Sequence, residues 1–474
     1  MSDTSGHERP RLAVLGLGHV GLPTALGFAE MGWEVIGSDD DASKVAMIRS
    51  GQAPFYEPGV QDLLIRGLTG GRLTVTACVG EAVRAATIIF VCVGTPQKDT
   101  GEADLSQVEA IARIVARNLN SYKLIVEKST VPAITAQWIK KTVARFAKPA
   151  HGPGSLHAEF DVASNPEFLQ EGRAIENILH PVRVILGVES DRARVLLERL
   201  YQPLGCPILI TNISTAELTK HAANAFLSTK ISFINMVADI CEAVGADVTQ
   251  VALGMGLDPR IGREFLNAGI GFGGHCFPKD LRALMHLARE REVDCGLLKE
   301  VEKINLRRAE IFLKKVRQAV WVLKGKKIGV LGLSFKGGTD DTRESPALRI
   351  VKVLLEEGAH LRVHDPQAMA ASQQEIPPQT GRLEYCSSPY EVAREADALL
   401  ILTEWEEYRE LDFLRLRELM EVPVIVDGRN LLDPEIVRAG GFEYLGMGRN
   451  PLEPEVAPLN GHKHSDVDRH DRAE

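Results

Sequence analysis

The stretch from Gly269 to Asp280 reads GIGFGGHCFPKD and has the residue types of a reactive loop. Four glycines precede Cys276, which predicts a loop pressed closely against a ligand or another backbone. The thiolate is the reactive form of cysteine, and a cation such as Lys279 beside it would lower the thiol pKa. We therefore interpret Cys276 as a nucleophile, against the alternative of a structural cysteine in a glycine-rich turn. Adjacent residues rarely supply two ligands to one ion, so His275 and Cys276 do not indicate zinc, and no metal site is expected.

Lys220 and Asn224 form a second candidate pair. They are four residues apart in a helical stretch and therefore lie on one helix face. A lysine and an amide can stabilise an oxyanion together, the first by charge and the second by a directed N–H. A solvated helix face is the alternative, but the small apolar residues around Asn224 favour burial.

Two carboxylates, Glu167 and Glu171, follow Pro166 with a spacing of four residues. One of them could act as a general base. They could equally belong to the acidic first turn of a helix, where the helix dipole favours carboxylates.

The sequence Gly16-Leu-Gly18-His-Val20-Gly21 follows an apolar strand and opens a helix. Glycines in this pattern let a pyrophosphate approach the amides at the helix N-terminus. Asp39 ends the next strand, where its carboxylate can bind ribose hydroxyls and repel a 2′-phosphate. The pattern predicts a dinucleotide site for NAD rather than NADP, with FAD as the competing dinucleotide.

These residues need a scaffold, and the apolar runs predict a doubly wound α/β fold. Strands are expected at 12–15, 34–37, 87–93 and 123–127, and the same pattern returns at 327–331, 361–364, 398–402 and 423–426. The second series begins without the glycine triplet, so it is expected to keep the fold without binding a dinucleotide. The fold class is therefore α/β, with two Rossmann-like doubly wound domains joined by a long central helix and helical domain.

The central helix is expected from Ser214 to Val244. Ser214 and Glu217 fit a capping box at its start, and Gly245 fits a stop. The helix could connect the two domains and offer a face for a dimer.

We expect five segments along the chain. These are a flexible N-terminus (1–10), an NAD-binding domain (11–210), a central helical domain with the cysteine loop and the dimer interface (211–315), a C-terminal Rossmann-like domain (316–450) and a disordered tail (451–474).

Composition excludes several classes of function. The net charge of −9 gives no basic surface for nucleic acid or anionic membranes. The first residues contain no apolar signal-peptide core, and no apolar run approaches membrane-spanning length. The seven cysteines are scattered without a CxxC pair, which argues against a disulfide framework. A cytoplasmic protein is expected.

Taken together, these motifs resemble the UDP-glucose/GDP-mannose dehydrogenase family over roughly residues 11 to 450. The matching stretches are Gly16–Pro23, Tyr56–Gly59, Val93–Pro96, Glu127–Pro132, Asn165–Glu171, Lys220–Asn224, Gly271–Asp280, Gly332–Pro346 and Asp427–Asn430. The resemblance implies that the C6 alcohol of a nucleotide sugar, UDP-glucose in the first place, is oxidised to a carboxylate with two NAD. It also implies a homodimer.

Carried onto this sequence, the resemblance gives each candidate a role. Cys276 would form a thiohemiacetal and then a thioester, Lys220 and Asn224 would stabilise the oxyanions, Asp280 with a water near Thr130 would take the first proton, and Glu167 would activate the hydrolytic water. Lys44, Thr95, Thr130, Glu171, Lys279 and Arg343 would join Gly16, Gly18, Val20, Gly21 and Asp39 at the cofactor. Phe168, Leu169, Phe265, Leu266, Asn267, Gly269, Gly273, Lys336 and Arg260 would hold the nucleotide sugar with Glu167, Lys220 and Asn224. The family's dimer arrangement would allow Arg260 to reach the partner subunit's site.

Other functions stay open at this point. GDP-mannose and UDP-N-acetylhexosamines are the alternative sugars. A single-step hydroxyacid dehydrogenase would also use a Rossmann domain and a Lys/Asn pair, but it needs no cysteine. A non-catalytic regulator that binds NAD or a nucleotide sugar is the alternative of another class.

Overall fold

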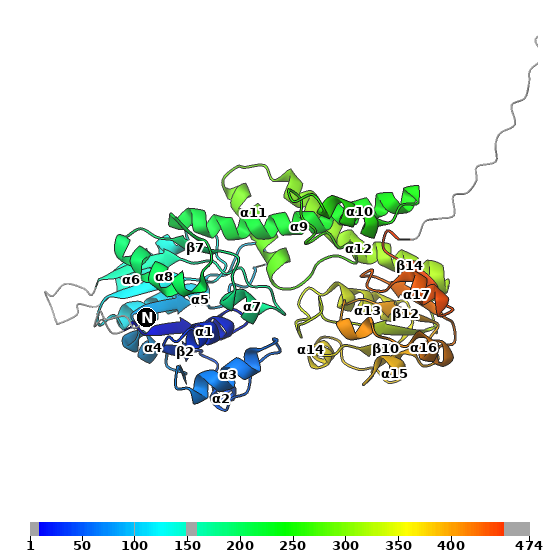
Figure 1. The fold of residues 1–474 in the computed structure, drawn as a ribbon, viewed down its shortest axis with the longest axis horizontal. Coiled ribbons are helices and arrows are strands. Elements are labelled where there is room, and N and C mark those ends of the chain that lie inside the picture. Colours follow the sequence, from blue (N-terminus) through cyan, green and yellow to red (C-terminus); the bar gives the residue numbers. More distant parts are fainter. Residues whose placement is uncertain (1–8, 99, 148–158, 450–474) are drawn as a thin grey trace, which may run out of the picture.

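Two β-sheets lie at the two ends of an elongated molecule, and a helical region connects them (Figure 1). The structure is a computed structural model that describes residues 9–98, 100–147 and 159–449. The expected disordered tail, and residues 1–8 of the expected flexible N-terminus, lie outside the described residues.

The first sheet has eight described strands in the order β3-β2-β1-β4-β5-β6-β7-β8. The paired strands run parallel except β6 and β7, which pair antiparallel. Its strands are β1 (Leu12–Leu15), β2 (Val35–Ser38), β3 (Leu73–Thr76), β4 (Ile88–Val91), β5 (Lys123–Glu127), β6 (Phe160–Ser164), β7 (Val184–Gly187) and β8 (Ile208–Thr211). Its helices are α1 (Gly21–Glu30), α2 (Ala42–Arg49), α3 (Val60–Thr69), α4 (Val79–Ala85), α5 (Ser106–Arg117), α6 (Thr135–Phe146), α7 (Ala174–Leu179), α8 (Asp191–Tyr201) and the 3-10 helix η1 (Gln202–Leu204).

The second sheet has six described strands, all parallel, in the order β11-β10-β9-β12-β13-β14. They are β9 (Lys327–Leu331), β10 (His360–His364), β11 (Leu383–Tyr385), β12 (Ala398–Ile401), β13 (Val424–Asp427) and β14 (Glu443–Gly446). The accompanying helices are α13 (Pro346–Glu356), α14 (Met369–Glu375), α15 (Pro389–Ala393), α16 (Phe413–Leu419), α17 (Pro434–Ala439) and the 3-10 helix η2 (Glu406–Tyr408).

Both sheets have the strand order of a doubly wound Rossmann fold, which confirms the predicted fold class. Numbered from its own first strand, each sheet reads 3-2-1-4-5-6, and the first sheet adds two strands beyond. Strands such as β1 and β4 consist of consecutive buried apolar residues, because helices cover both faces of a parallel sheet. In this fold, ligands bind at the carboxyl ends of the strands, where the strand order reverses.

The central helical region consists of α9 (Ile213–Val244), α10 (Val248–Gly256), α11 (Cys276–Glu290) and α12 (Gly296–Val320). Helix α9 runs along the molecule and packs against α11, α12 and β7 (Figure 1). The predicted stop at Gly245 is confirmed, because this glycine has a φ of 73°. No helix among the described residues is long and apolar enough to cross a membrane.

The predicted capping box at the start of α9 is wrong. The helix begins one residue earlier, and the side chain of Asn212 accepts the N–H of Thr215 as the cap. The carboxylate of Glu217 is used elsewhere and accepts the N–H groups of Ile134 and Ala136 at 2.7 and 2.9 Å. A tertiary contact therefore replaced the local one that the sequence pattern predicted.

Candidate active site

Cys276 is the first residue of α11 and follows a loop that touches the C-terminal domain. The N–H of Gly274, whose φ is 80°, donates to the carbonyl of Arg343 at 2.9 Å. A Cβ on Gly273 would lie 2.4 Å from the carbonyl oxygen of Glu344. Both glycines are therefore required for the close backbone approach that the sequence predicted.

The electrostatics around Cys276 differ from the expectation. Burial raises the pKa of the thiol to about 12, and Glu167, Asp280 and Glu171 add to this shift. Lys220 is the cation that opposes it, whereas Lys279 pairs with Asp280 at 2.8 Å. The expectation that Lys279 lowers the thiol pKa is therefore wrong, and the resting thiol is neutral.

Lys220, on α9, forms a buried ion pair with Glu167. Nζ lies 2.8 Å from Oε1, and the two side chains are 5% and 4% exposed. Burial lowers the pKa of Lys220, but Glu167, Asp280 and Cys276 outweigh burial and hold that pKa above its usual value. The prediction that this helix face is buried is confirmed, and it places an ammonium group beside the thiol.

Asn224 lies one turn further along α9 and donates to Asp280. Its Nδ2 is 2.6 Å from Oδ2 of Asp280, while Lys279 pairs with Oδ1. Burial raises the pKa of Asp280, but the nearby Lys279, His221 and Lys220 outweigh burial. The pKa of this carboxyl therefore lies below its usual value. The structure thus brings together a neutral thiol, an ammonium, an amide and an ionised carboxylate.

Thr95 and Thr130 come from loops after β4 and β5, at the carboxyl edge of the first sheet. The Thr95 hydroxyl donates to the carbonyl of Thr130 at 2.9 Å, and Lys279 reaches the same hydroxyl at 3.5 Å. The two threonines therefore connect this sheet edge to α11.

Glu171 lies between the two domains, so its surroundings differ from those of Glu167. The Lys336 ammonium donates to its carbonyl, and Arg343 lies 4.0 Å from its carboxylate. Burial and Asp341 raise the pKa of Glu171 to about 7, against the effect of Arg343 and Lys336. Residues 165–170 are not helical, so the alternative of an acidic helix turn is wrong.

The glycine loop after β1 has the shape that a pyrophosphate requires. Gly16 has a φ of 92°, and a Cβ on Gly21 would lie 1.7 Å from the carbonyl oxygen of Gly16. A Cβ on Gly18 would meet no atom within 4 Å, so the backbone there borders open space. The amides at the start of α1, beside Val20, can therefore receive a phosphate.

Asp39 lies against this loop in the position where a ribose would bind. Its Oδ2 accepts the N–H of Leu17 at 2.7 Å and pairs with Lys44 at 2.9 Å. The glycine loop, Asp39 and Lys44 are thus one connected unit, and its donor and acceptor groups fit an adenine dinucleotide.

Phe168 and Leu169 line a pocket of about 530 Å³ beside Glu167. Arg183 stacks over the Phe168 ring at 3.9 Å, and the N–H of Leu169 donates to Glu167 at 2.6 Å. This pocket therefore adjoins the carboxylate of Glu167.

The remaining candidates are distributed over the central region. Gly269 is held by Asn235 and Arg308, Phe265 contacts the Phe277 ring, and Leu266 is buried in the core. Asn267 accepts a hydrogen bond from Arg263. Arg260 is not gathered with the cysteine cluster, because its side chain is 87% exposed and pairs with Asp258 at 2.6 Å.

Two charged residues of this site were not predicted from the sequence. Lys128 is buried after β5, where its Nζ donates to Asn165 at 3.0 Å and burial lowers its pKa. Asp341 holds the Arg343 guanidinium at 2.9 and 2.7 Å. Lys128 could have been found, because it directly follows a strand whose carboxyl end faces the site. Asp341 carried no such signal.

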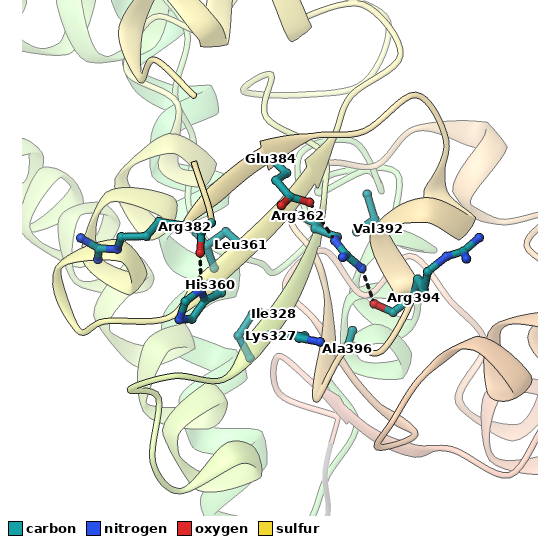
Figure 2. Close-up of a pocket in the computed structure, with 11 residues that line it drawn as sticks. Lys327, Ile328, His360, Leu361, Arg362, Arg382, Glu384, Val392, Arg394 and Ala396 are labelled. Carbon is teal, nitrogen blue, oxygen red and sulfur yellow. Dashed lines mark hydrogen bonds and ion pairs between the residues drawn. The ribbon is translucent and has the colours of Figure 1, made fainter. Parts of the chain in front are cut away.

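A second pocket, of about 430 Å³, lies away from the cysteine (Figure 2). It is lined by His360, Arg362 and Lys327 at the amino ends of β9 and β10, opposite the edge where ligands bind in this fold. Arg362 is already bonded to Glu384 and to the carbonyl of Arg394. Within the described residues, no group of three or more His, Cys, Asp or Glu could hold a metal ion.

Comparisons with known proteins give the same family for three successive parts of the chain. Three family models match in order: the NAD binding domain of the UDP-glucose/GDP-mannose dehydrogenase family at residues 10–205, its central domain at 214–307 and its UDP binding domain at 329–434. The UDP-glucose 6-dehydrogenase TuaD of Bacillus subtilis is 44% identical over 92% of this chain and 93% of its own length.

Two solved structures share the architecture. A UDP-glucose dehydrogenase from Pyrobaculum islandicum superposes with a TM-score of 0.85 and 36% identity, covering 95% of this chain and 100% of that protein. A UDP-D-ManNAc dehydrogenase from Pyrococcus horikoshii superposes with a TM-score of 0.81 and 31% identity, covering 93% and 100%.

Proposed function

The chain belongs to the UDP-glucose/GDP-mannose dehydrogenase family, and on that premise we propose that it oxidises UDP-glucose to UDP-glucuronate with two NAD. The buried cluster of Cys276, Lys220, Asn224 and Asp280 carries this proposal. A hydroxyacid dehydrogenase would not need the thiol, and a binding protein would need neither the thiol nor the charges around it. NAD, when bound at the glycine loop, accepts one hydride in each of two oxidations.

In the first oxidation, Asp280 serves as the base through a water near Thr130. The carboxylate is ionised at neutral pH, so it can take the proton of the C6 hydroxyl while the C6 hydride leaves. Asn224 and Lys220 then lie near the aldehyde oxygen that results. Their N–H groups stabilise negative charge on that oxygen.

Cys276 then captures the aldehyde, and its thiol supplies the proton that this addition requires. The Sγ–C6 bond forms as the thiol proton passes to the former carbonyl oxygen, which gives a thiohemiacetal and retains the aldehyde. The thiohemiacetal hydroxyl proton then passes to solvent water as the second hydride leaves C6, which gives a thioester. Lys220 stabilises the oxyanion at each addition.

Hydrolysis releases the product. Glu167 takes a proton from water, the resulting hydroxide oxygen bonds to C6, and the C6–Sγ bond breaks. The thiol regains its proton and the sugar leaves as a carboxylate. The Lys220 ammonium, 2.8 Å from Oε1 of Glu167, would hold this carboxylate in place beside the thioester.

The cofactor and substrate residues divide between the two domains. Gly16, Gly18, Asp39 and Lys44 hold the adenosine and pyrophosphate of NAD, and Glu171 and Arg343 complete the site at the domain boundary. Lys336 and the loop from Phe265 to Gly269 bind the nucleotide sugar. The corresponding segments are 11–210 for NAD, 211–315 for the centre and 316–450 for the nucleotide sugar.

The protein also forms a homodimer through α9. An apolar stripe on this helix is exposed in the single chain, with Phe226 and Val244 65% and 70% exposed. The stripe consists of Phe226, Phe233, Met236, Ile240 and Val244, which recur at helical spacing. A second copy of the helix would cover this stripe.

The proposed location is the cytoplasm. All seven cysteines are free, which fits its reducing environment.

The test counts NADH formed per UDP-glucose consumed with NAD in excess. Two NADH per sugar, lost in a folded Cys276→Ala variant and kept in a Cys78→Ala control at an exposed cysteine, is the expected result. One NADH per sugar would contradict the thioester route and support the single-step dehydrogenase. GDP-mannose and the UDP-N-acetylhexosamines are run in parallel. Binding of NAD or sugar without turnover of any of them would indicate the regulator.

A further inference from the structure

The loop between α2 and α3 carries a buried carboxylate that no step of the proposed reaction uses. Glu57 is 6% exposed and accepts the N–H groups of Gly172 and Ala174, each at 2.8 Å. Ala174 is the first residue of α7, and the cap residue of that helix, Arg173, provides no side-chain hydrogen bond. A carboxylate more than a hundred residues away therefore holds the chain that leads into α7.

The other side of the same chain segment touches the C-terminal domain. The carbonyl of Glu171 accepts a hydrogen bond from Lys336, and Gly172 has a φ of 83°. A Cβ on Gly172 would lie 3.0 Å from the carbonyl oxygen of Gly338. Residues 171–172 are thus held between Glu57 and the loop that begins at Lys336.

The loop that carries Glu57 has two further contacts. The N–H of Tyr56 donates to Asp340 of the C-terminal domain at 3.0 Å. The Phe55 ring packs on the ring of His19 with centroids 4.1 Å apart, and His19 belongs to the glycine loop. Residues 55–57 therefore contact the dinucleotide loop, the segment at 171–174 and the C-terminal domain.

We propose that Glu57 is a positioning residue that fixes the positions of Glu171 and Lys336. It thereby couples the cofactor site to the nucleotide-sugar site. This inference rests on the proposed function for the roles of those two residues. Without the carboxylate, two buried amides lose their acceptor and the segment is released. Lys336 would then lose the fixed carbonyl that orients its ammonium.

The experiment compares Glu57→Gln and Glu57→Ala with a matched control, Glu109→Gln, whose exposed side chain pairs with Arg113 on α5. We expect kcat/KM for UDP-glucose to fall at least tenfold in Glu57→Ala, mainly through KM, and less in Glu57→Gln, which keeps one acceptor oxygen. The control should match the unmodified protein. Circular dichroism and Tm establish folding, and the near-isosteric Glu57→Gln decides the question if Glu57→Ala does not fold.

A double-mutant cycle with Lys336→Ala separates positioning from a merely structural role. If Glu57 acts through Lys336, Glu57→Gln should change the UDP-glucose KM by less than about twofold in the Lys336→Ala background. Calorimetric binding of UDP should weaken in the same non-additive pattern, and it is measurable even if UDP-glucose is not the substrate. A lowered Tm with unchanged KM and unchanged UDP affinity, or effects that simply multiply, would overturn the proposal.

Discussion

At the residue scale, the central feature of the site is a thiol that is kept neutral. Cys276 begins a helix, where negative charge is favoured, yet burial and three carboxylates dominate and raise its pKa to about 12. A neutral thiol is protected from adventitious electrophiles and carries the proton that the thiohemiacetal oxygen needs.

This arrangement predicts slow alkylation of Cys276 in the ligand-free protein. At pH 8, iodoacetamide should modify Cys276 at least tenfold more slowly than the exposed Cys78, as followed by peptide mass spectrometry. A raised pKa means that the thiolate is scarce below that pKa, so the Cys276 rate should rise about tenfold per pH unit between pH 8 and 10. Lys220→Ala removes the opposing cation and should slow the reaction further. Equal rates for the two cysteines at pH 7 would show an activated thiolate instead.

At the element scale, α9 organises the site because one helix supplies both Lys220 and Asn224 and leaves an apolar stripe exposed. The N-terminal cap of this long helix is Asn212 and not Ser214. Glu217, the expected partner of Ser214, instead connects α9 to the start of α6. The position of Lys220 relative to the first sheet depends on this connection.

Two substitutions distinguish these caps. Asn212→Ala should cost about 1 kcal/mol locally, the usual value of an N-cap, and should speed hydrogen exchange in the first turn of α9 about fivefold. Ser214→Ala should leave exchange in that turn unchanged. Exchange is read by mass spectrometry on peptides that cover residues 212–220. A larger effect for Ser214→Ala than for Asn212→Ala would restore the capping-box interpretation.

At the scale of the whole molecule, Cys276 lies in the central helical region that connects the two Rossmann-like domains (Figure 1). The glycine loop belongs to the domain of the first sheet and Lys336 to that of the second, so in the proposed reaction cofactor and nucleotide sugar would approach the cysteine from different domains. Arg260 is separate from this cluster in a single chain. The proposed dimer gives it a role if it reaches the partner subunit's site.

Subunit complementation tests that arrangement. Cys276→Ala and Arg260→Ala should each be strongly impaired as homodimers, while a mixed dimer of the two should regain one working site. That site combines an intact Cys276 from one subunit with an intact Arg260 from the other. Activity of purified, differently tagged mixed dimers gives the readout. No recovery would place Arg260 within its own subunit's site, and a fully active Arg260→Ala homodimer would place it outside both sites.

The sequence by itself predicted four strands of each sheet and the glycine loop after β1, and Cys276 as the nucleophile stays a prediction. These features are local: buried parallel strands require consecutive apolar residues, a pyrophosphate loop requires glycine, and the loop before Cys276 requires glycines for close backbone approach. The family resemblance then added roles for residues such as Asp280 and Glu167. Thr95, Thr130 and Lys128 follow strand ends, so the fold rule could place them near a ligand.

Only the tertiary structure decided what each charge does. Lys279 pairs with Asp280 and leaves the thiol pKa high, Glu217 bonds to α6 instead of capping its own helix, and Glu57 holds a segment that lies far away in sequence. Electrostatic effects depend on burial and on distances of a few ångströms between groups from different elements. Local sequence fixes neither quantity, so the charge state and the partners of these residues follow from the packing of the whole chain.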